Sequence, residues 1–204
     1  MLLKKGILIV FEGIDGAGKS TQAKLLQKRL RAKGFDPVYF REPSRSKWGL
    51  EIKKKALKPD SLSPEEELDL FLKDRKENVE KNLKPALEKR KIVLLDRYYF
   101  STIAYQGARG IDPERIRKLN ERFAVKPDLV FILDVDAPKG LARIQDRKKK
   151  DRLFEREDYL RKVRHIFNSF KGRRFVKING LANKSAIHEE IAVRVSRYIK
   201  KFLQ

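Results

Sequence analysis

The sequence predicts an α/β protein in which a five-stranded parallel sheet is flanked by helices. Short apolar runs that could form buried strands alternate along the chain with amphipathic segments of helical spacing. No internal repeat, no linker rich in glycine, serine or proline, and no low-complexity tail divides the 204 residues. We therefore expect a single domain over residues 1–204, because right-handed crossovers between parallel strands place helices on both faces of one sheet.

The first strand and helix are expected at the start of the chain. The run GILIVFEG, residues 6–13, is almost continuously apolar and ends at a glycine, as a strand buried on both faces should. In residues 19–34, Ala23, Leu25, Leu26 and Leu30 recur near helical spacing, and the expected helix ends at Gly34. PVYF, residues 37–40, is expected to form a second short strand.

A long helix is expected from Ser63 onward. Ser63 is followed three residues later by Glu66, which is the spacing of a capping box, and Pro64 occupies the first helical position. Pro85 should end or kink this helix, because its ring displaces a backbone hydrogen bond. The apolar residues that keep to one face of the helix are Leu68, Phe71, Leu72, Val79 and Leu83.

Three further strands and a final helix complete the expected fold. The strands are KIVLLDR at residues 91–97, LVFILDV at residues 129–135 and RFVKING at residues 173–180. An amphipathic helix should run from about residue 184 to the end of the chain.

Composition excludes several classes of function. The absence of cysteine excludes disulfides, thiolate chemistry and cysteine-based zinc sites, and two histidines argue against a histidine-rich metal site. The longest apolar run is far too short to span a bilayer and no secretion signal is visible, so we expect a cytoplasmic protein without a membrane partner. The abundance of lysine and glutamate also resembles proteins from thermophiles.

The formal net charge of +22 implies attraction to polyanions, which include nucleic acids, anionic membranes and nucleotides. Charge alone does not choose among these partners. A nucleic-acid-associated ATPase is one alternative that this charge raises, but no known nucleic-acid-binding motif is visible, so no specific nucleic acid is expected.

GIDGAGKS, residues 13–20, matches the phosphate-binding pattern G-x-x-x-x-G-K-S/T at every fixed position, between a strand and a helix. Its glycines would let backbone N–H groups turn toward phosphate oxygens at the positive end of the helix. Lys19 would reach the β- and γ-phosphates, and Ser20 would hold Mg²⁺. A nucleoside triphosphate site is the prediction, and an ordinary glycine-rich turn is the alternative.

Charged residues follow two of the expected strands. Asp96 ends the run VLLD, where it could hold Mg²⁺ directly or through water, because strand ends of a parallel sheet lie beside such a loop. Arg41 and Arg97 directly follow strands, and Arg75 lies in the long helix. Arginine at a strand end suits bidentate binding of a second phosphate, although a chain this basic carries arginine in many places.

Six segments share an order and spacing with one known family: FEGIDGAGKSTQAKLL, REP at residues 41–43, FLKDR at 71–75, DRYYFSTIAYQG at 96–107, PDLVFILDV at 127–135 and RLFERED at 152–158. The chain resembles the thymidylate kinases, and DRY..S..AYQG after the phosphate-binding loop is specific to them. The resemblance implies a P-loop nucleoside monophosphate kinase fold with a short lid. It also implies transfer of the ATP γ-phosphoryl group to dTMP, giving dTDP and ADP, by a homodimer.

The resemblance also implies roles for individual residues. ATP would contact Gly13, Ile14, Asp15, Gly16, Ala17, Gly18, Lys19, Ser20, Thr21 and Arg143, with Ser20 and Asp96 as metal ligands. For dTMP, Phe71 would stack on thymine and Arg75 would bind its edge, and their i, i+4 spacing puts both on one helix face. The other dTMP residues would be Asp15 near the 3′-hydroxyl, Arg41 and Arg97 at the phosphate, Tyr98 at the 2′ position, and Ser101, Tyr105 and Gln106 around the base.

Two of these assignments have a plainer alternative, since Phe71 and Tyr105 could simply pack in the core. Pro43 matches a position where the family has a cis proline.

QDRKKKDRLFER, residues 145–156, falls where the family has its lid. Members with glycine at the position of Gly16 carry basic lid residues, so Arg147 and Arg152, with Lys150 as a further candidate, would cover the ATP phosphates and expel water. Together with Lys19 and Arg97, these arginines would be the catalytic cations. A solvated run of charge is the alternative for Lys148 and Lys149.

One segment departs from the family pattern. After REP the family usually continues GGT..GE.IR, whereas this chain has SRSKWGLEIK at residues 44–53. Ser44 and Arg45 replace glycines and Lys53 replaces an arginine, so another deoxynucleoside monophosphate could be the better acceptor. Trp48 could pack over the base or over the second helix. A protein of the same fold that binds nucleotides without turnover is disfavoured by the retained cations and Asp96.

Overall fold

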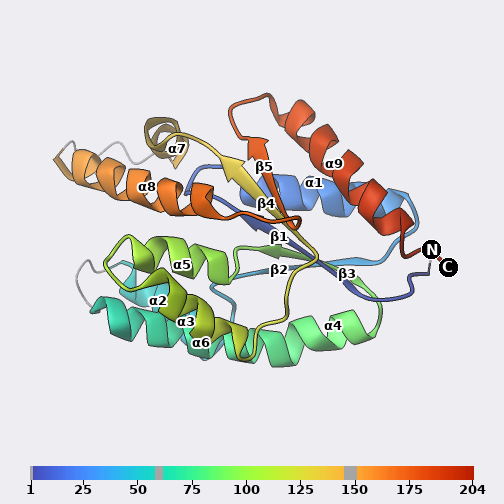
Figure 1. The fold of residues 1–204 in the computed structure, drawn as a ribbon, viewed down its shortest axis with the longest axis horizontal. Helices are drawn as coiled ribbons and strands as arrows, with labels where there is room; N and C mark the ends of the chain where they lie inside the picture. Colours follow the sequence, from blue (N-terminus) through green and yellow to red (C-terminus); the bar gives the residue numbers. More distant parts are fainter. Residues whose placement is uncertain (1, 58–61, 145–150) are drawn as a thin grey trace.

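The computed structural model describes residues 2–57, 62–144 and 151–204. Within them, five strands form one parallel sheet in the order β2-β3-β1-β4-β5, which confirms the predicted architecture (Figure 1). The strands are β1 (Ile7–Glu12), β2 (Pro37–Arg41), β3 (Ile92–Asp96), β4 (Leu129–Asp134) and β5 (Phe175–Asn179). Each begins within two residues of its predicted position.

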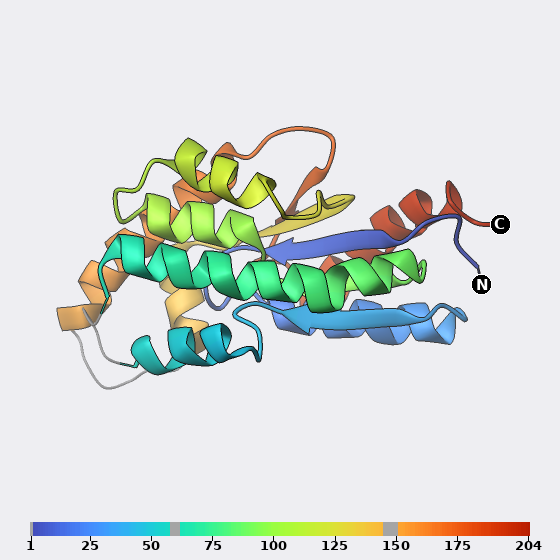
Figure 2. The same cartoon turned by 90° about the horizontal axis from the view of Figure 1, so that it is seen from below.

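Helices cover both faces of the sheet. The helix α1 (Lys19–Ala32) and the last helix, α9 (Lys184–Lys200), lie together on one side (Figure 1). The opposite side carries α3 (Pro64–Asn78), α4 (Lys84–Glu88), α5 (Tyr99–Gly107) and α6 (Pro113–Glu121) (Figure 2). The remaining helices are α2 (Lys47–Lys55), α7 (Ala137–Ile144) and α8 (Asp151–Ser169).

The central strand β1 and its neighbours β3 and β4 form the middle of the core. Every residue of β1 is buried, as its continuous apolar run predicted, and so is every residue of β3. The edge strand β2 is only partly buried. Both chain termini meet at the amino end of the strands, where Leu3 pairs with Leu203, so the carboxyl end of the sheet is left for a site.

The long predicted helix begins as expected. The Ser63 hydroxyl accepts a hydrogen bond from the Glu66 N–H at 3.3 Å, and the Glu66 carboxylate accepts one from the Ser63 N–H at 2.8 Å. The predicted capping box is therefore confirmed, with Pro64 in the first turn.

Pro85 does not end this helix. A single π-helical turn, η1 (Val79–Leu83), precedes it and the chain continues as α4 through Glu88. A π turn shifts the backbone hydrogen-bond pattern and bends a helix locally, so of the two outcomes predicted for Pro85 the structure has a distortion and not an end. The predicted apolar face is also partly wrong, because Leu70 is buried while Phe71 and Leu72 are only half-buried.

No described helix is long and apolar enough to cross a membrane.

Truncation of Ile9 in β1 should destabilise the fold strongly, because this side chain is fully buried at the centre of the sheet. Ile9→Ala is expected to lower the free energy of unfolding by about 2–5 kcal/mol, measured by urea denaturation. Val193→Ala, on the exposed side of α9, is the control and should change it by less than about 0.5 kcal/mol. Equal effects at the two positions would contradict this assignment of the core.

Candidate nucleotide-binding site

The loop between β1 and α1 has the backbone geometry of a phosphate cradle. Gly13 and Gly16 have φ values of 135° and 79°, and a Cβ at Gly16 would lie 2.1 Å from the carbonyl oxygen of Gly140. Only glycine fits such positions. Gly18 precedes α1, and no described side chain caps this helix, so its first N–H groups and its positive dipole end are available to an anion.

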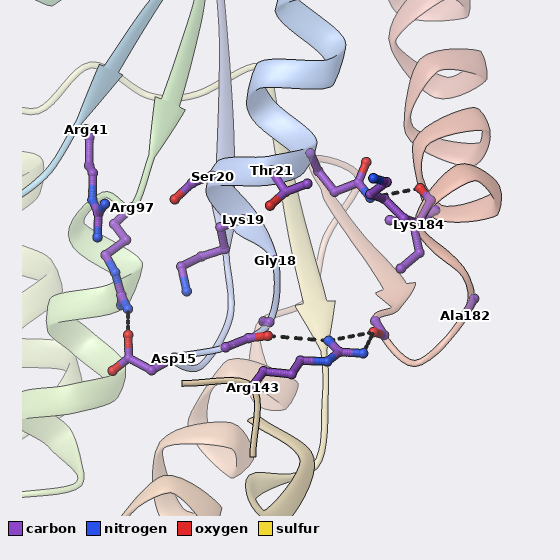
Figure 3. Close-up of a pocket in the computed structure, with 15 residues that line it drawn as sticks. Asp15, Gly18, Lys19, Ser20, Thr21, Arg41, Arg97, Arg143, Ala182 and Lys184 are labelled. Carbon is purple, nitrogen blue, oxygen red and sulfur yellow. Dashed lines mark hydrogen bonds and ion pairs between the residues drawn. The ribbon is translucent and has the colours of Figure 1, made fainter. Parts of the chain in front are cut away.

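A cavity of about 450 Å³ opens in front of this loop (Figure 3). The Lys19 side chain is buried beneath it and donates to the carbonyl oxygens of Gly13 at 2.9 Å and Ile14 at 2.7 Å. Burial lowers the pKa of Lys19, and the nearby Arg97 charge adds to that effect. A bound polyphosphate would act in the opposite direction and favour the charged ammonium.

Ser20 lines the cavity and contacts Asp96, which is buried behind it at the end of β3, beside the loop as the sequence predicted. The Ser20 hydroxyl donates to Oδ2 of Asp96, and the Tyr39 hydroxyl donates to the same oxygen at 3.0 Å. The other carboxylate oxygen, Oδ1, is buried and has no hydrogen-bond partner among the described residues. An unpartnered carboxylate oxygen beside a hydroxyl fits Mg²⁺, which prefers oxygen ligands and keeps several waters or phosphate oxygens.

The described residues contain no cluster of three or more acidic, histidine or cysteine side chains that could hold a metal. A cation at Ser20 and Asp96 would therefore depend on phosphate oxygens for the rest of its coordination shell.

Arg97 lies between the loop and α5. Its guanidinium pairs with Asp15, donates to the Ser101 hydroxyl at 3.3 Å and lies 5.2 Å from the centre of the Tyr105 ring. The Tyr105 hydroxyl in turn accepts from the Asp15 N–H at 3.1 Å. Arg41 approaches the same region from the end of β2 (Figure 3). Two arginines and Lys19 thus surround the loop at the carboxyl end of the sheet.

A second cavity, of about 280 Å³, adjoins the first. Both cavities are lined by Asp15, Arg41 and Arg97, so they meet at these residues. The second cavity contains eight of the nine residues predicted for the acceptor: Asp15, Arg41, Phe71, Arg75, Arg97, Tyr98, Ser101 and Tyr105. Gln106 is not among its lining residues. Its amide donates to Glu67 at 2.6 Å, and Glu67 lines the cavity instead.

Arg75 is more deeply engaged than the sequence suggested. Its guanidinium is buried and donates to Glu42 at 2.8 Å, to Asn120 at 2.6 Å and to Thr102 at 3.0 Å. Three of the five N–H donors of an arginine are therefore used within the protein. Few remain for a ligand.

Tyr98 is also fully buried, and its hydroxyl donates to the Val125 carbonyl at 3.2 Å. Its position in the cavity wall is fixed by that bond. Burial raises the pKa of this phenol, so it stays neutral.

The segment that departs from the family pattern is held by Asp74, a buried residue of α3. Its carboxylate accepts from the Ser44 N–H at 2.8 Å, from the Ser44 hydroxyl at 2.5 Å and from the Ser46 hydroxyl at 2.7 Å. Lys53 donates to the Ser44 carbonyl at 2.7 Å. Ser44, at a position where the family pattern has glycine, and Ser46, two residues later, therefore fix this loop. The Glu42–Pro43 peptide before them is cis, as the resemblance implied.

Trp48 packs over α3 and does not line either cavity among the described residues. Its ring lies below two ammonium groups, those of Lys47 at 4.4 Å and Lys73 at 5.0 Å. Of the two alternatives for Trp48, this geometry favours packing over α3, the second helix expected from the sequence.

Arg143, which was predicted to contact ATP, bridges two walls of the first cavity. Its guanidinium donates to the Gly180 carbonyl at 3.2 Å and to the Gly16 carbonyl at 3.4 Å (Figure 3). The loop after β5 forms the rest of that wall, and the Gln22 amide ties this loop to α1 through the Lys184 carbonyl at 3.0 Å. Sequence reasoning missed this wall, which comprises Gln22, Gly180, Ala182, Lys184 and Ile187.

The predicted lid, residues 145–156, lies outside the part of the chain whose side chains are described. Its catalytic assignments, Arg147 and Arg152, therefore stay predictions.

Comparison with known proteins identifies the family. A family model described as thymidylate kinase matches residues 11–191. The chain is 46% identical over 197 residues to a probable thymidylate kinase of Archaeoglobus fulgidus, which covers 97% of this chain and 96% of that protein. It is 47% identical over 194 residues to the thymidylate kinase of Akkermansia muciniphila, with 95% and 91% of the two chains covered. The chain therefore belongs to the thymidylate kinase family.

Proposed function

We propose that this protein transfers the γ-phosphoryl group of ATP to dTMP and releases dTDP and ADP. The observation that carries the proposal is the junction of the two cavities. One cavity is built on a phosphate-binding loop and the other on an aromatic wall, and they share Asp15, Arg41 and Arg97. A donor phosphate chain and an acceptor phosphate would therefore meet beside two arginines, as an in-line transfer requires.

The donor half follows from the loop. The triphosphate of ATP would lie against the N–H groups at the start of α1, with Lys19 at its β- and γ-phosphates and Arg143 beside the remaining part of the cavity. Ser20 and Asp96 would hold Mg²⁺, which when bound neutralises charge on the transferring phosphates.

The acceptor half follows from the aromatic cavity. Phe71 would stack on thymine, and the remaining donors of Arg75 would reach its edge. Arg41 and Arg97 would bind the monophosphate, which is largely dianionic at neutral pH because its second pKa is about 6. Such an acceptor needs no strong general base. The chemistry then depends on cations that reduce repulsion between two anions.

The lid would supply the remaining cations. Arg147 and Arg152 would close over the ATP phosphates and exclude water that could otherwise hydrolyse ATP. The family resemblance further supports a homodimer in the cytoplasm.

A panel of nucleoside monophosphates tests the function directly. With Mg-ATP, the purified protein should form diphosphate product fastest from dTMP, as measured by chromatography, and EDTA should abolish the product. A faster reaction with another deoxynucleoside monophosphate would mean that this compound is the preferred acceptor, and that the altered segment at residues 44–53 changes the choice of substrate. Folded protein that makes no diphosphate from any acceptor would refute the kinase assignment.

Loss of the Phe71 ring should weaken acceptor binding selectively. Because stacking on a base contributes about 1–3 kcal/mol, Phe71→Ala is expected to raise KM for dTMP by about tenfold or more and to leave KM for ATP nearly unchanged. Leu72→Ala is the matched control, since Leu72 is its neighbour but lies outside the lining of both cavities. Equal changes in the two KM values would count against stacking.

Removal of a lid arginine should slow turnover while the fold survives. Arg147→Ala and Arg152→Ala are each expected to lower kcat by at least about tenfold, because an arginine at the transferring phosphoryl group is worth a large factor. Lys148→Ala serves as the control, and circular dichroism checks folding. Near-normal kcat in both arginine variants would mean that the segment is only a solvated run of charge.

A further inference from the structure

Glu12, the last residue of β1, is a fully buried carboxylate to which the proposed mechanism assigns no role. Its Oε1 accepts from the Tyr98 N–H at 2.8 Å and from the Ser101 N–H at 3.2 Å, and its Oε2 accepts from the Ser101 hydroxyl at 2.5 Å. These bonds satisfy the start of α5, where no side chain of the N-cap residue itself acts as a cap. Glu12 therefore joins the end of β1 to the start of α5.

The backbone at Arg97 needs such an anchor. Arg97 has a φ of 69°, in the left-handed region that is unfavourable for a residue with a side chain. The Arg97 N–H donates to the Phe11 carbonyl at 3.0 Å, and the next N–H, that of Tyr98, donates to Glu12 at 2.8 Å. Two successive residues of β1 thus hold the peptide groups on both sides of Arg97. A strained conformation persists only where its surroundings fix it in this way.

The side chain of Arg97 is linked to Glu12 as well. Ser101 donates its hydroxyl proton to Glu12, so a lone pair of the same oxygen remains to accept from the Arg97 guanidinium at 3.3 Å. The carboxylate also attracts the guanidinium through space. Burial raises the pKa of Glu12, whereas the Ser101 hydrogen bond and the Arg97 charge oppose that rise and favour the anion.

We propose that Glu12 is a positioning residue that holds Arg97, through its flanking peptide and through Ser101, in the orientation that serves phosphoryl transfer. This inference rests on the proposed kinase function. The competing role is a structural one, in which Glu12 only caps α5 and contributes nothing to turnover. The two roles predict different outcomes for the same substitution.

Glu12→Gln separates them, because glutamine keeps the shape and one acceptor oxygen but replaces the other oxygen with a donor. Its amide would donate to Ser101, leave the Ser101 proton without its acceptor and remove the charge that attracts Arg97. We expect kcat for dTDP formation to fall by at least about tenfold, with KM for ATP changed by less than about twofold. An unchanged kcat, with or without a lower melting temperature, would overturn the proposal.

A double-mutant cycle shows whether the effect passes through Arg97. If it does, Glu12→Gln combined with Arg97→Ala should be no slower than Arg97→Ala alone, within about twofold. Losses that multiply in the double variant would mean that Glu12 acts elsewhere and would overturn the inference.

Asp128→Asn is the matched control, because Asp128, the residue before β4, anchors the amino end of β1 as Glu12 anchors its carboxyl end. Asp128 accepts from the Leu8 N–H at 2.8 Å and from the Tyr198 hydroxyl at 2.7 Å, which are the same kinds of bond, but it lies away from both cavities. This variant should lose stability and keep its kcat; a loss of kcat equal to that of Glu12→Gln would show a general effect of strand anchoring and count against the proposal.

The wild-type protein distinguishes a failure of the proposed kinase function from a failure of the role proposed for Glu12. Wild-type protein that makes no dTDP would refute the function, whereas normal turnover of Glu12→Gln would refute only the role of Glu12.

Discussion

The register of three neighbouring strands is the constraint on which the site depends. Phe11 of β1 pairs with Asp96 of β3, and Asp96 pairs in turn with Arg41 of β2, so these residues form one row across the sheet. The chain leaves all three strands just beyond this row. The phosphate-binding loop, Arg97 and the cis peptide before Pro43 therefore begin side by side. A one-residue slip of β3 would reverse the direction of Asp96 and remove it from Ser20.

The cations gathered at this edge are balanced by the carboxylates close to them. Arg75 has Glu42 and Arg97 has Asp15, while the Lys19 ammonium is held by loop carbonyls. Buried charges persist only when paired or well hydrogen-bonded, because the interior solvates ions poorly. The Arg97–Asp15 pair lines both cavities, so an incoming phosphate could take over part of the guanidinium. The Arg75–Glu42 pair is enclosed and is better suited to hold the wall.

Much of this architecture was predictable from local sequence. Strands buried on both faces appear as continuous apolar runs, and the capping box at Ser63 is a pattern within four residues. The phosphate-binding loop was predictable in the same way, because its backbone has positive φ angles that require glycine at fixed positions. Features that depend on contacts distant in sequence were not predictable. Asp74 reaches Ser44 across thirty positions, and nothing near either residue indicates the bond.

The errors have the same physical origin. Hydrophobic spacing alone placed Phe71 on the apolar face of the long helix, but the helix buries Leu70 instead and Phe71 lies in the wall of a cavity, which agrees with the family resemblance and not with core packing. Hydrophobic spacing cannot distinguish a side chain that fills the core from one that awaits a ligand. The π turn before Pro85 likewise depends on the helix remaining packed on both sides of the distortion. The short helices α2, α5, α6 and α7 carry too few residues for a clear period.

Asp74 and Arg75 explain how α3 could select an acceptor by the distance between its base and its phosphate. Asp74 holds the loop at Ser44, and Arg75 holds Glu42, so one turn of the helix fixes the chain on both sides of the cis peptide. That chain follows directly from Arg41, while Phe71 lies one turn earlier on the same helix. A base stacked on Phe71 and a phosphate bound by Arg41 would therefore be held by a single rigid unit. The separation of base and phosphate is then set by bonds within the protein, and a ligand must match it to contact both ends.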